Sequence, residues 1–403
     1  MICKIKTCTI KLTVYLSAAL STVAAYSQVS SAVGRIDAAS TTSSPVAWIY
    51  VANTPEKGSP NEIVAYSAMP NGALAEIPGS PFAENVGSMA VNGKYLMGAS
   101  NKAEEINAYY MESNGALAYK ATTSYDIDNG NCTDCTSAGQ IFFDHSGASL
   151  YVQEFQSDEN TGIASFEVIK TTGGLNYLGY ANTGAFPGLN TAAYFIGDDL
   201  YAYTAVDSAC MYYSVDGFKR DSNGLLVGID TKWNYPTPPS GVRGYIPNLA
   251  AADPTNHVAF IMQPANPPGC ASGPLQLASY TAESSGNLTT TNTAENMPDT
   301  AIVNFHDLKM APSGKLLAVS GQEGLQIFHF NGASPITKYT GLLTKDPINQ
   351  MFWDNNNHLY AIGHASNKLF VFTITPTGYE AAPGSPYSIT SPDAIILQPL
   401  PRY

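Results

Sequence analysis

The sequence predicts an all-β chain that folds as a seven-bladed β-propeller with four antiparallel strands in each blade. Three observations support this prediction. A pattern of strands and turns recurs seven times at intervals of about 50 residues, a length that suits one four-stranded blade. Asn-Gly or Gly-Asn turns follow several of these strands, and no sustained helical period of apolar residues follows the N-terminal 27 residues.

Each repeat contains two recognisable strands in which apolar and polar residues alternate, as expected for half-buried strands. The second strands of the blades are predicted at Ile49–Val51, Tyr95–Met97, Leu150–Val152, Leu200–Ala202, Val258–Phe260, Leu316–Ala318 and Leu359–Ala361. The third strands are predicted at Ile63–Tyr66, Ile106–Tyr109, Ile163–Phe166, Met211–Val215, Leu275–Tyr280, Leu325–Phe330 and Leu369–Phe372.

The turns after the third strands share one chemistry. Asn71-Gly72 and Asn114-Gly115 occupy the same place in adjacent repeats, and Asn223-Gly224 repeats the pair later. Asn-Gly is the strongest short hairpin signal, and in a two-residue hairpin both central residues take positive φ. The sequence therefore predicts tight hairpins with positive φ at both positions.

The two ends of the propeller are predicted to join. The first repeat lacks an innermost strand, because Ile49–Val51 already reads as a second strand. Residues 393–399 resemble residues 307–312, which open the sixth repeat. We therefore expect residues 391–399 to supply the inner strand of the first blade, which would remove an exposed sheet edge. The alternative is a loose C-terminal tail.

Residues 1–27 are predicted to be a signal peptide. Lys4, Lys6 and Lys11 precede or begin an apolar stretch, and small residues end it at Ala25-Tyr26-Ser27. The apolar stretch is short for a membrane span. The alternatives are an uncleaved anchor or an apolar start without a targeting role. We expect a secreted or periplasmic protein without membrane insertion after cleavage, with a flexible lead-in at 28–44 and the propeller at 45–403.

The charge balance excludes nucleic acid as a partner. The net charge of −13 becomes −16 when the three lysines of residues 1–27 are removed, since no acidic residue leaves with them. Phosphate backbones require clustered Lys and Arg. The sequence contains no haem-attachment or dinucleotide motif, so no cofactor is expected. The acidic run at 126–131 could suggest calcium, but its spacing is not that of an EF-hand, and we predict no metal.

Four cysteines follow the signal peptide, and an even number in an exported chain favours disulfides. Cys132 and Cys135 are predicted to form one disulfide; a zinc site or a redox pair is the alternative. Cys210 and Cys270 follow second strands in neighbouring repeats, so we expect an inter-blade disulfide there, with two buried thiols as the alternative.

The Tyr50-Val51-x-Asn53 motif, followed by Ile63-x-x-Tyr66 and Gly72-x-Leu74, resembles the YVTN-repeat and lactonase-like propeller superfamily, which includes 6-phosphogluconolactonases. The resemblance covers nearly the whole chain after the signal peptide and implies the seven-bladed fold. It also implies lactone hydrolysis or cyclisation. Gly139 and Gln140 stand where the enzymes of this group carry Arg and His, whereas Glu154 matches their acidic residue loosely.

Strand order places the inter-blade loops and the loops between second and third strands on one face of the propeller. We expect this loop face to bind ligands by analogy with other propellers. The candidate catalytic residues on it are Glu154, Arg243, His306 and His364. The candidate ligand-binding residues are Asn53, Tyr245, Asp307 and Gln322. Three other histidines, His145, His257 and His358, fall in turns on the opposite face and are expected to be solvated.

Two functions follow from these observations. The first expectation is a monomeric, non-catalytic module that binds an unknown small molecule, glycan or protein through the loop face. The alternative is a lactonase-like hydrolase or cyclase with an altered active site. Lactone hydrolysis needs a base to activate water and a donor for the developing oxyanion. A cluster of Glu154, Arg243, His306 and His364 around the channel mouth would favour the enzyme, whereas scattered positions would favour the binding module.

Overall fold

The computed structural model describes residues 44–401 of the chain, apart from gaps at 54–60, 85, 101–104, 126–139, 155–161, 183–192, 209–211, 267–268, 272 and 376. The predicted signal peptide and nearly all of the predicted lead-in therefore lie outside the described residues. The part that is described contains thirty β-strands and no helix. It accordingly offers no helical candidate for a membrane span.

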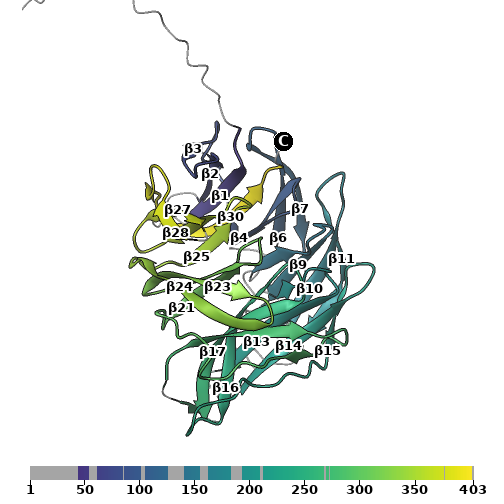
Figure 1. Cartoon of the computed structure of the whole chain (residues 1–403). Helices are drawn as coiled ribbons and strands as arrows, with labels where there is room; N and C mark the ends of the chain where they lie inside the picture. The colour runs from purple at the N-terminus through teal and green to yellow at the C-terminus, as the bar shows by residue number, and fades with distance from the viewer. Residues whose placement is uncertain are drawn as a thin grey trace, which may run out of the picture. The chain divides into compact units, whose positions relative to one another are not determined.

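The strands form seven antiparallel blades, as predicted (Figure 1). From blade 1 to blade 7, the inner strands are β30 (Pro392–Pro399), β4 (Val86–Val91), β8 (Ile141–Phe143), β12 (Tyr194–Phe195), β16 (Gly244–Ala252), β21 (Phe305–Met310) and β25 (Gln350–Trp353). The second strands are β1 (Ala47–Asn53), β5 (Tyr95–Ser100), β9 (Ser149–Glu154), β13 (Tyr201–Ser208), β17 (His257–Asn266), β22 (Leu316–Gly321) and β26 (His358–Gly363).

The outer half of each blade follows the same order. The third strands are β2 (Glu62–Ala68), β6 (Glu105–Met111), β10 (Gly162–Val168), β14 (Tyr212–Arg220), β19 (Gln276–Ala282), β23 (Gly324–Asn331) and β27 (Lys368–Thr375). The outermost strands are β3 (Leu74–Glu76), β7 (Leu117–Ser124), β11 (Leu175–Asn182), β15 (Leu226–Ile229), β20 (Leu288–Thr289), β24 (Ser334–Thr344) and β28 (Gly378–Ala381). Two short strands, β18 (Gly269–Cys270) and β29 (Tyr387–Ser388), pair with β17 and β27.

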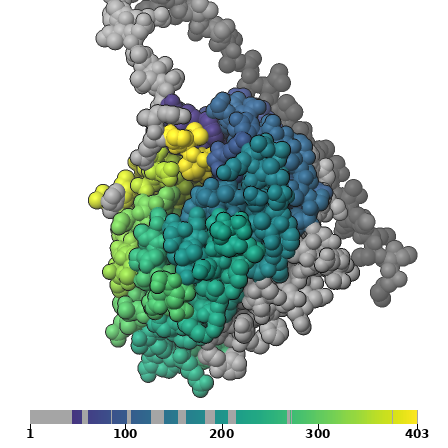
Figure 2. Space-filling model, turned by 90° about the vertical axis from the view of Figure 1, so that its right-hand side faces the viewer, coloured from purple at the N-terminus to yellow at the C-terminus, as the bar shows by residue number. Residues whose placement is uncertain are grey.

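The C-terminal strand closes the first blade, which confirms the prediction for residues 391–399. β30 pairs with β1 in antiparallel register from Ala47 opposite Pro399 to Asn53 opposite Pro392, with one irregularity next to Asn53. The purple β1 and the yellow β30 lie side by side in Figures 1 and 2. Closure satisfies the inner edge of β1, which would otherwise be exposed.

The apolar core consists of seven main clusters, one between each pair of neighbouring blades. β1 shows how the alternation of side chains builds them. Ile49 and Val51 pack towards blade 7, whereas Trp48 and Tyr50 pack towards blade 2. Second strands are therefore buried on both faces, and every residue of β1 is buried.

The hairpins after the third strands differ from the prediction in one respect. Gly72 and Gly115 have φ of 80° and 87°, but the asparagine before each glycine is not among the residues with positive φ. The Gly72 N–H donates to the Met69 carbonyl, and the Met69 N–H donates to the Ala73 carbonyl. The prediction of positive φ at both positions was wrong because these loops are one residue longer than a two-residue hairpin, so only glycine takes the left-handed position.

Candidate functional site

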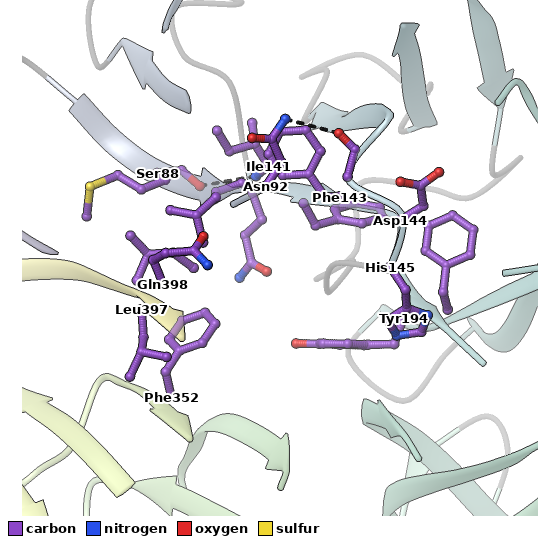
Figure 3. Close-up of a pocket in the computed structure, with 18 of the residues that line it drawn as sticks. Ser88, Asn92, Ile141, Phe143, Asp144, His145, Tyr194, Phe352, Leu397 and Gln398 are labelled. Atoms are coloured by element: carbon purple, nitrogen blue, oxygen red, sulfur yellow. Dashed lines mark hydrogen bonds between the residues drawn. The ribbon is translucent and has the colours of Figure 1, made fainter. Parts of the chain in front are cut away.

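A cavity of about 570 Å³ lies in the centre of the propeller, a size typical of small-molecule sites. The inner strands of all seven blades contribute to its wall. Figure 3 shows aromatic and polar side chains arranged around it. The lining includes the ends of the inner strands and residues of their following turns, such as Asn92 and His145. The cavity therefore extends towards the hairpin face, opposite the loop face on which the sequence placed a ligand.

Side chains of the inner strands link one blade to the next around this cavity. The Ser88 hydroxyl accepts a hydrogen bond from the Ile141 N–H at 3.1 Å, between blades 2 and 3. The Gln350 side-chain oxygen accepts one from the Ile395 N–H at 2.6 Å, between blades 7 and 1. These bonds satisfy polar groups that the sheets leave unpaired and hold the side chains in place.

Lys309 places a positive charge at the cavity. Its Nζ donates to the Tyr194 hydroxyl at 3.0 Å and lies 3.3 Å from Oδ1 of Asp307. It also lies 4.8 Å from the centre of the Phe352 ring. Burial lowers the pKa of Lys309, but attraction to Asp307 and Tyr194 outweighs that effect and raises the pKa above its ordinary value. Lys309 is therefore cationic at neutral pH.

Asp307 holds Lys309 in this position. The two residues are two apart on β21 and so share one face of the strand. The other carboxylate oxygen of Asp307 accepts a hydrogen bond from the Met351 N–H of blade 7 at 3.0 Å. Asp307 thus joins two blades and balances the charge of Lys309.

His145 forms a histidine–carboxylate pair at the cavity. Its Nδ1 lies 2.7 Å from Oδ1 of Asp199, and its main-chain N–H donates to the same oxygen. The hydrogen bond to Asp199 raises the pKa of His145 above its ordinary value. Since Nδ1 faces Asp199, Nε2 is the ring nitrogen left to exchange a proton.

The other two turn histidines are also paired with carboxylates. His257 lies 3.1 Å from Asp253, and His358 lies 2.7 Å from Asp354. The expectation of solvated turn residues was wrong for His358, which is 2% exposed, because Asp354 at the preceding turn provides a buried partner. Neither histidine lines the cavity, whereas His145 does.

The candidate catalytic residues from the sequence lie apart from this cavity. Arg243 is exposed just before β16. His306 and His364 are exposed on the loop face, where their Nδ1 atoms lie 2.9 Å and 3.1 Å from the main-chain carbonyls of Ile348 and Pro392. These three residues are absent from the cavity lining. Glu154 ends β9, and its side chain lies outside the described residues.

Of the four candidate ligand-binding residues, three also lie away from the cavity. Tyr245 is fully buried in the core between blades 4 and 5, and its hydroxyl donates to Gln276 at 2.9 Å. Asn53 is 1% exposed at the end of β1, and Gln322 is exposed on the loop face. Of the four, Asp307 is the one next to the cavity, through its contact with Lys309.

The predicted disulfides fall largely outside the described residues. Cys132, Cys135 and Cys210 lie in the gaps, and so does the acidic run at 126–131. The backbone of Cys270 pairs with Ala265 in β18, but its side chain is not described. In the described ranges, no group of three or more His, Cys, Asp or Glu side chains could hold a metal ion.

Sequence reasoning missed Ser88, Tyr194, Lys309 and Gln350. It expected His145 to be solvated, and the side chain is 56% exposed, but it did not predict that the turn of His145 borders the cavity. One signal was available for Lys309: Asp307 and Lys309 are opposite charges two residues apart in a predicted inner strand, and such residues share one face. Tyr194 belongs to a strand of two residues, too short to be recognised from alternation.

The fold is a seven-bladed β-propeller, as the sequence resemblance implied, and proteins with lactonase names are among the solved structures similar to it. Among solved structures, a putative 6-phosphogluconolactonase from Bacteroides fragilis matches with a TM-score of 0.64 and 12% identity, over 89% of this chain and 99% of that one. The periplasmic gluconolactonase of Pseudomonas aeruginosa matches with a TM-score of 0.62 and 14% identity, over 88% and 100%.

The likeness extends to proteins with other names. A hypothetical selenium-binding protein from Sulfolobus tokodaii matches with a TM-score of 0.55 and 9% identity, over 88% of this chain and 94% of that one. No protein-family model and no curated protein sequence matches this chain. At these identities the structural likeness establishes the fold, and the function must be argued from the site.

Proposed function

We propose that this protein hydrolyses a small lactone in its central cavity. The observation that carries the proposal is that Lys309, Tyr194 and His145 line one cavity, where Lys309 bonds to Tyr194 and His145 is paired with Asp199. Together they supply the two functions that lactone hydrolysis requires, a base for water and donors for the oxyanion.

Lys309 and Tyr194 are suited to bind the lactone carbonyl. An ammonium group has three hydrogens, and the described contacts of Lys309 engage two of them, with Tyr194 and Asp307. The Tyr194 hydroxyl accepts the bond from Lys309, so its own hydrogen is left for a ligand. Both groups would strengthen their bonds to the carbonyl oxygen as it becomes negatively charged.

His145 is suited to act as the general base. Asp199 orients its ring and stabilises the imidazolium that forms when His145 takes a proton from water. The oxygen of that water would then bond to the carbonyl carbon. When the bond between this carbon and the ring oxygen breaks, His145 would return the proton to that oxygen. The product is a hydroxy acid, and the enzyme is regenerated.

The lactonase-like alternative has better support than the non-catalytic binding module that the sequence first suggested. Three of the similar structures carry lactonase names. The proposed active site is the central cavity. It does not include Arg243, His306 and His364, the residues that the sequence suggested for an altered lactonase site. The name of the Pseudomonas aeruginosa neighbour includes a periplasmic location, which agrees with the export expected from residues 1–27. Sequencing the N-terminus of the exported protein would test that location.

The test is hydrolysis of a panel of sugar and aliphatic lactones by the purified protein and two variants. Tyr194→Phe removes one oxyanion donor and is expected to lower kcat about 10²-fold. His145→Gln removes the base and is expected to lower kcat by about 10²-fold or more. The proposal fails if no lactone is hydrolysed above background, or if both variants keep full activity.

Two matched controls separate chemistry from folding. Tyr201→Phe removes a hydroxyl that donates to the Ser284 carbonyl, away from the cavity lining. His257→Gln removes a histidine that is likewise paired with an aspartate but does not line the cavity. Both controls should keep kcat close to that of the unmodified protein.

A further inference from the structure

We infer that the cavity selects an uncharged, polyhydroxylated lactone and discriminates against a phosphorylated one, with Gln350 and Ser88 as residues that determine this specificity. The inference rests on the proposed function and extends it to the class of substrate. It follows from two properties of the cavity wall: which hydrogen-bonding atoms are still available, and how its charges are matched.

The available polar groups on the wall are mainly donors. Ser88 and Gln350 each use an oxygen to accept a hydrogen bond from the main chain of the next blade, and Tyr194 accepts one from Lys309. In the described part of the chain, the hydroxyl hydrogens of Ser88 and Tyr194 and the side-chain amide hydrogens of Gln350 meet no protein acceptor. A wall of this kind complements a ligand rich in hydroxyl, ether and carbonyl oxygens.

The same bonds fix the direction of these donors. Ser88 cannot turn away without leaving the Ile141 N–H unpaired, and Gln350 cannot turn away without leaving the Ile395 N–H unpaired. An unpaired buried donor is unfavourable, so the two side chains are preorganised. A site built to hydrogen-bond substrate hydroxyls rejects analogues that lack them far more strongly than an apolar pocket does.

The charges of the wall are matched within the protein. Lys309 pairs with Asp307, His145 with Asp199, and Asp144 with Arg220 at 2.7 Å. A phosphate dianion is usually bound by several Arg or Lys groups, or by a cluster of main-chain donors. Among the described residues that line the cavity, Lys309 is the one Lys or Arg, and Asp307 already balances it. The chain as a whole is acidic, with a net charge of −13, which further opposes a dianion.

The aromatic residues complete the site for a ring-shaped ligand. Phe143, Tyr194 and Phe352 line the cavity, and Figure 3 shows their rings distributed around it. Their apolar faces suit the C–H faces of a sugar ring, while the donors suit its oxygens. A lactone without hydroxyl groups would use the aromatic walls but leave most of the donors unpaired.

The first test compares kcat/KM for three kinds of lactone. D-glucono-δ-lactone and D-galactono-lactone are uncharged and polyhydroxylated, 6-phospho-D-glucono-δ-lactone is phosphorylated, and δ-valerolactone has no hydroxyl group. We expect one of the uncharged sugar lactones to exceed both other substrates by at least about tenfold. If the phosphorylated lactone or δ-valerolactone is hydrolysed as well as the sugar lactones, the inference is overturned but the proposed hydrolase stands.

A second measurement tests the specificity separately from the proposed hydrolysis. Isothermal titration calorimetry measures the binding of glucose, galactose and their 6-phosphates. If no lactone is hydrolysed, stronger binding of an unphosphorylated sugar than of its 6-phosphate would still support the specificity of the cavity. Stronger binding of a phosphorylated sugar, or no binding of any of the four, would overturn it.

Two variants test the assigned groups. Gln350→Glu keeps an acceptor for the Ile395 N–H but removes the amide donor, so KM for the sugar lactone should rise about tenfold. Asn296→Asp makes the corresponding change at an exposed residue outside the lining, whose side-chain oxygen accepts from the Thr293 N–H, and is the control. Asp307→Asn removes the charge that balances Lys309 and should shift the kcat/KM ratio severalfold towards the phosphorylated lactone. An unchanged ratio in Asp307→Asn, or an unchanged KM in Gln350→Glu, would contradict the inference.

Discussion

The hydroxyl of Tyr50 in blade 1 donates a hydrogen bond to the main-chain carbonyl of Gly115 in blade 2, at 2.8 Å. The same bond recurs from Tyr151 to Gly224 at 2.8 Å and from Tyr203 to Gly286 at 3.1 Å. A buried tyrosine of a second strand thus reaches the outer hairpin of the following blade. The tyrosine and the glycine turn of the sequence repeat are two halves of one inter-blade contact.

Tyr50→Phe is therefore expected to destabilise the fold with little change in packing. It leaves the Gly115 carbonyl without its partner, at a cost of about 1–2 kcal/mol in the free energy of unfolding. Urea denaturation measures the change. Tyr119→Phe is the control, because Tyr119 is 59% exposed and should change the stability by less than about 0.5 kcal/mol. Equal effects in the two variants would refute a stabilising role for the inter-blade bond.

The closing strand should contribute strongly to stability. Ile395 of β30 is 1% exposed and packs in the cluster between blades 1 and 7. Ile395→Ala is expected to lower the free energy of unfolding by about 2–5 kcal/mol, because it removes buried carbon atoms and leaves a cavity. Asp393→Ala changes an exposed residue of the same strand and should be nearly neutral. Thermal unfolding of both variants distinguishes a packed closing strand from a loose tail, for which both would be neutral.

The His145–Asp199 pair predicts a specific dependence of rate on pH. The base must be unprotonated, and Asp199 raises the pKa of His145, so the rate should increase as the pH rises through that raised pKa. Asp199→Asn removes the charge and should move this midpoint to lower pH while lowering kcat. The pH profile of kcat for the two proteins measures the shift. If the midpoint of the pH profile is the same in both proteins, a group other than His145 controls the increase of kcat with pH.

The same pair should affect stability in the acid range. A histidine whose pKa is raised by folding stabilises the protein below its unfolded pKa of about 6.5, and this contribution is lost as the pH rises through the folded pKa. Asp199 stays ionised at pH 5, because its own pKa is lowered. Asp199→Asn should therefore lower the melting temperature more at pH 5 than at pH 8.5. An equal loss at both pH values would argue against the charge interaction.

Asp216 predicts a substitution that stabilises the protein. Burial raises the pKa of Asp216 to about 6, although the Ser214 hydroxyl donates to its Oδ1 at 2.8 Å. An aspartate with a raised folded pKa favours folding at acid pH, and the protein loses stability as the pH rises from about 4 to 6. Asp216→Asn should therefore raise the free energy of unfolding by about 1–3 kcal/mol at pH 7. The gain should vanish near pH 3.5; a gain that is equal at both pH values would contradict this account.

The candidate site was much harder to predict than the blades. Arg243, His306 and His364 are the residue types that hydrolases use, and they follow or precede predicted strands, but their side chains are exposed or bonded to main-chain carbonyls of the next blade. His306 lies at an irregularity of β21, between Phe305 and Asp307 in the pairing with β22, which sequence alternation does not reveal.

Tyr194 and Lys309 show why the site could not be assembled from local patterns. They lie 115 positions apart in the sequence, on blades 4 and 6, and they meet because both inner strands border the same cavity. A repeat identifies the inner strand of each blade but not which of its side chains point into the channel. That depends on the register and on short or irregular strands such as β12.

The sequence alone determined the number of blades, the order of strands within them and the closure by residues 391–399. These features depend on local alternation and turn chemistry, which each repeat carries by itself. Only the tertiary structure decided that Ser88, His145, Tyr194, Lys309 and Gln350 share one cavity. The physical reason is that each blade contributes only part of the cavity wall, so the site exists only when the ring of seven blades is closed.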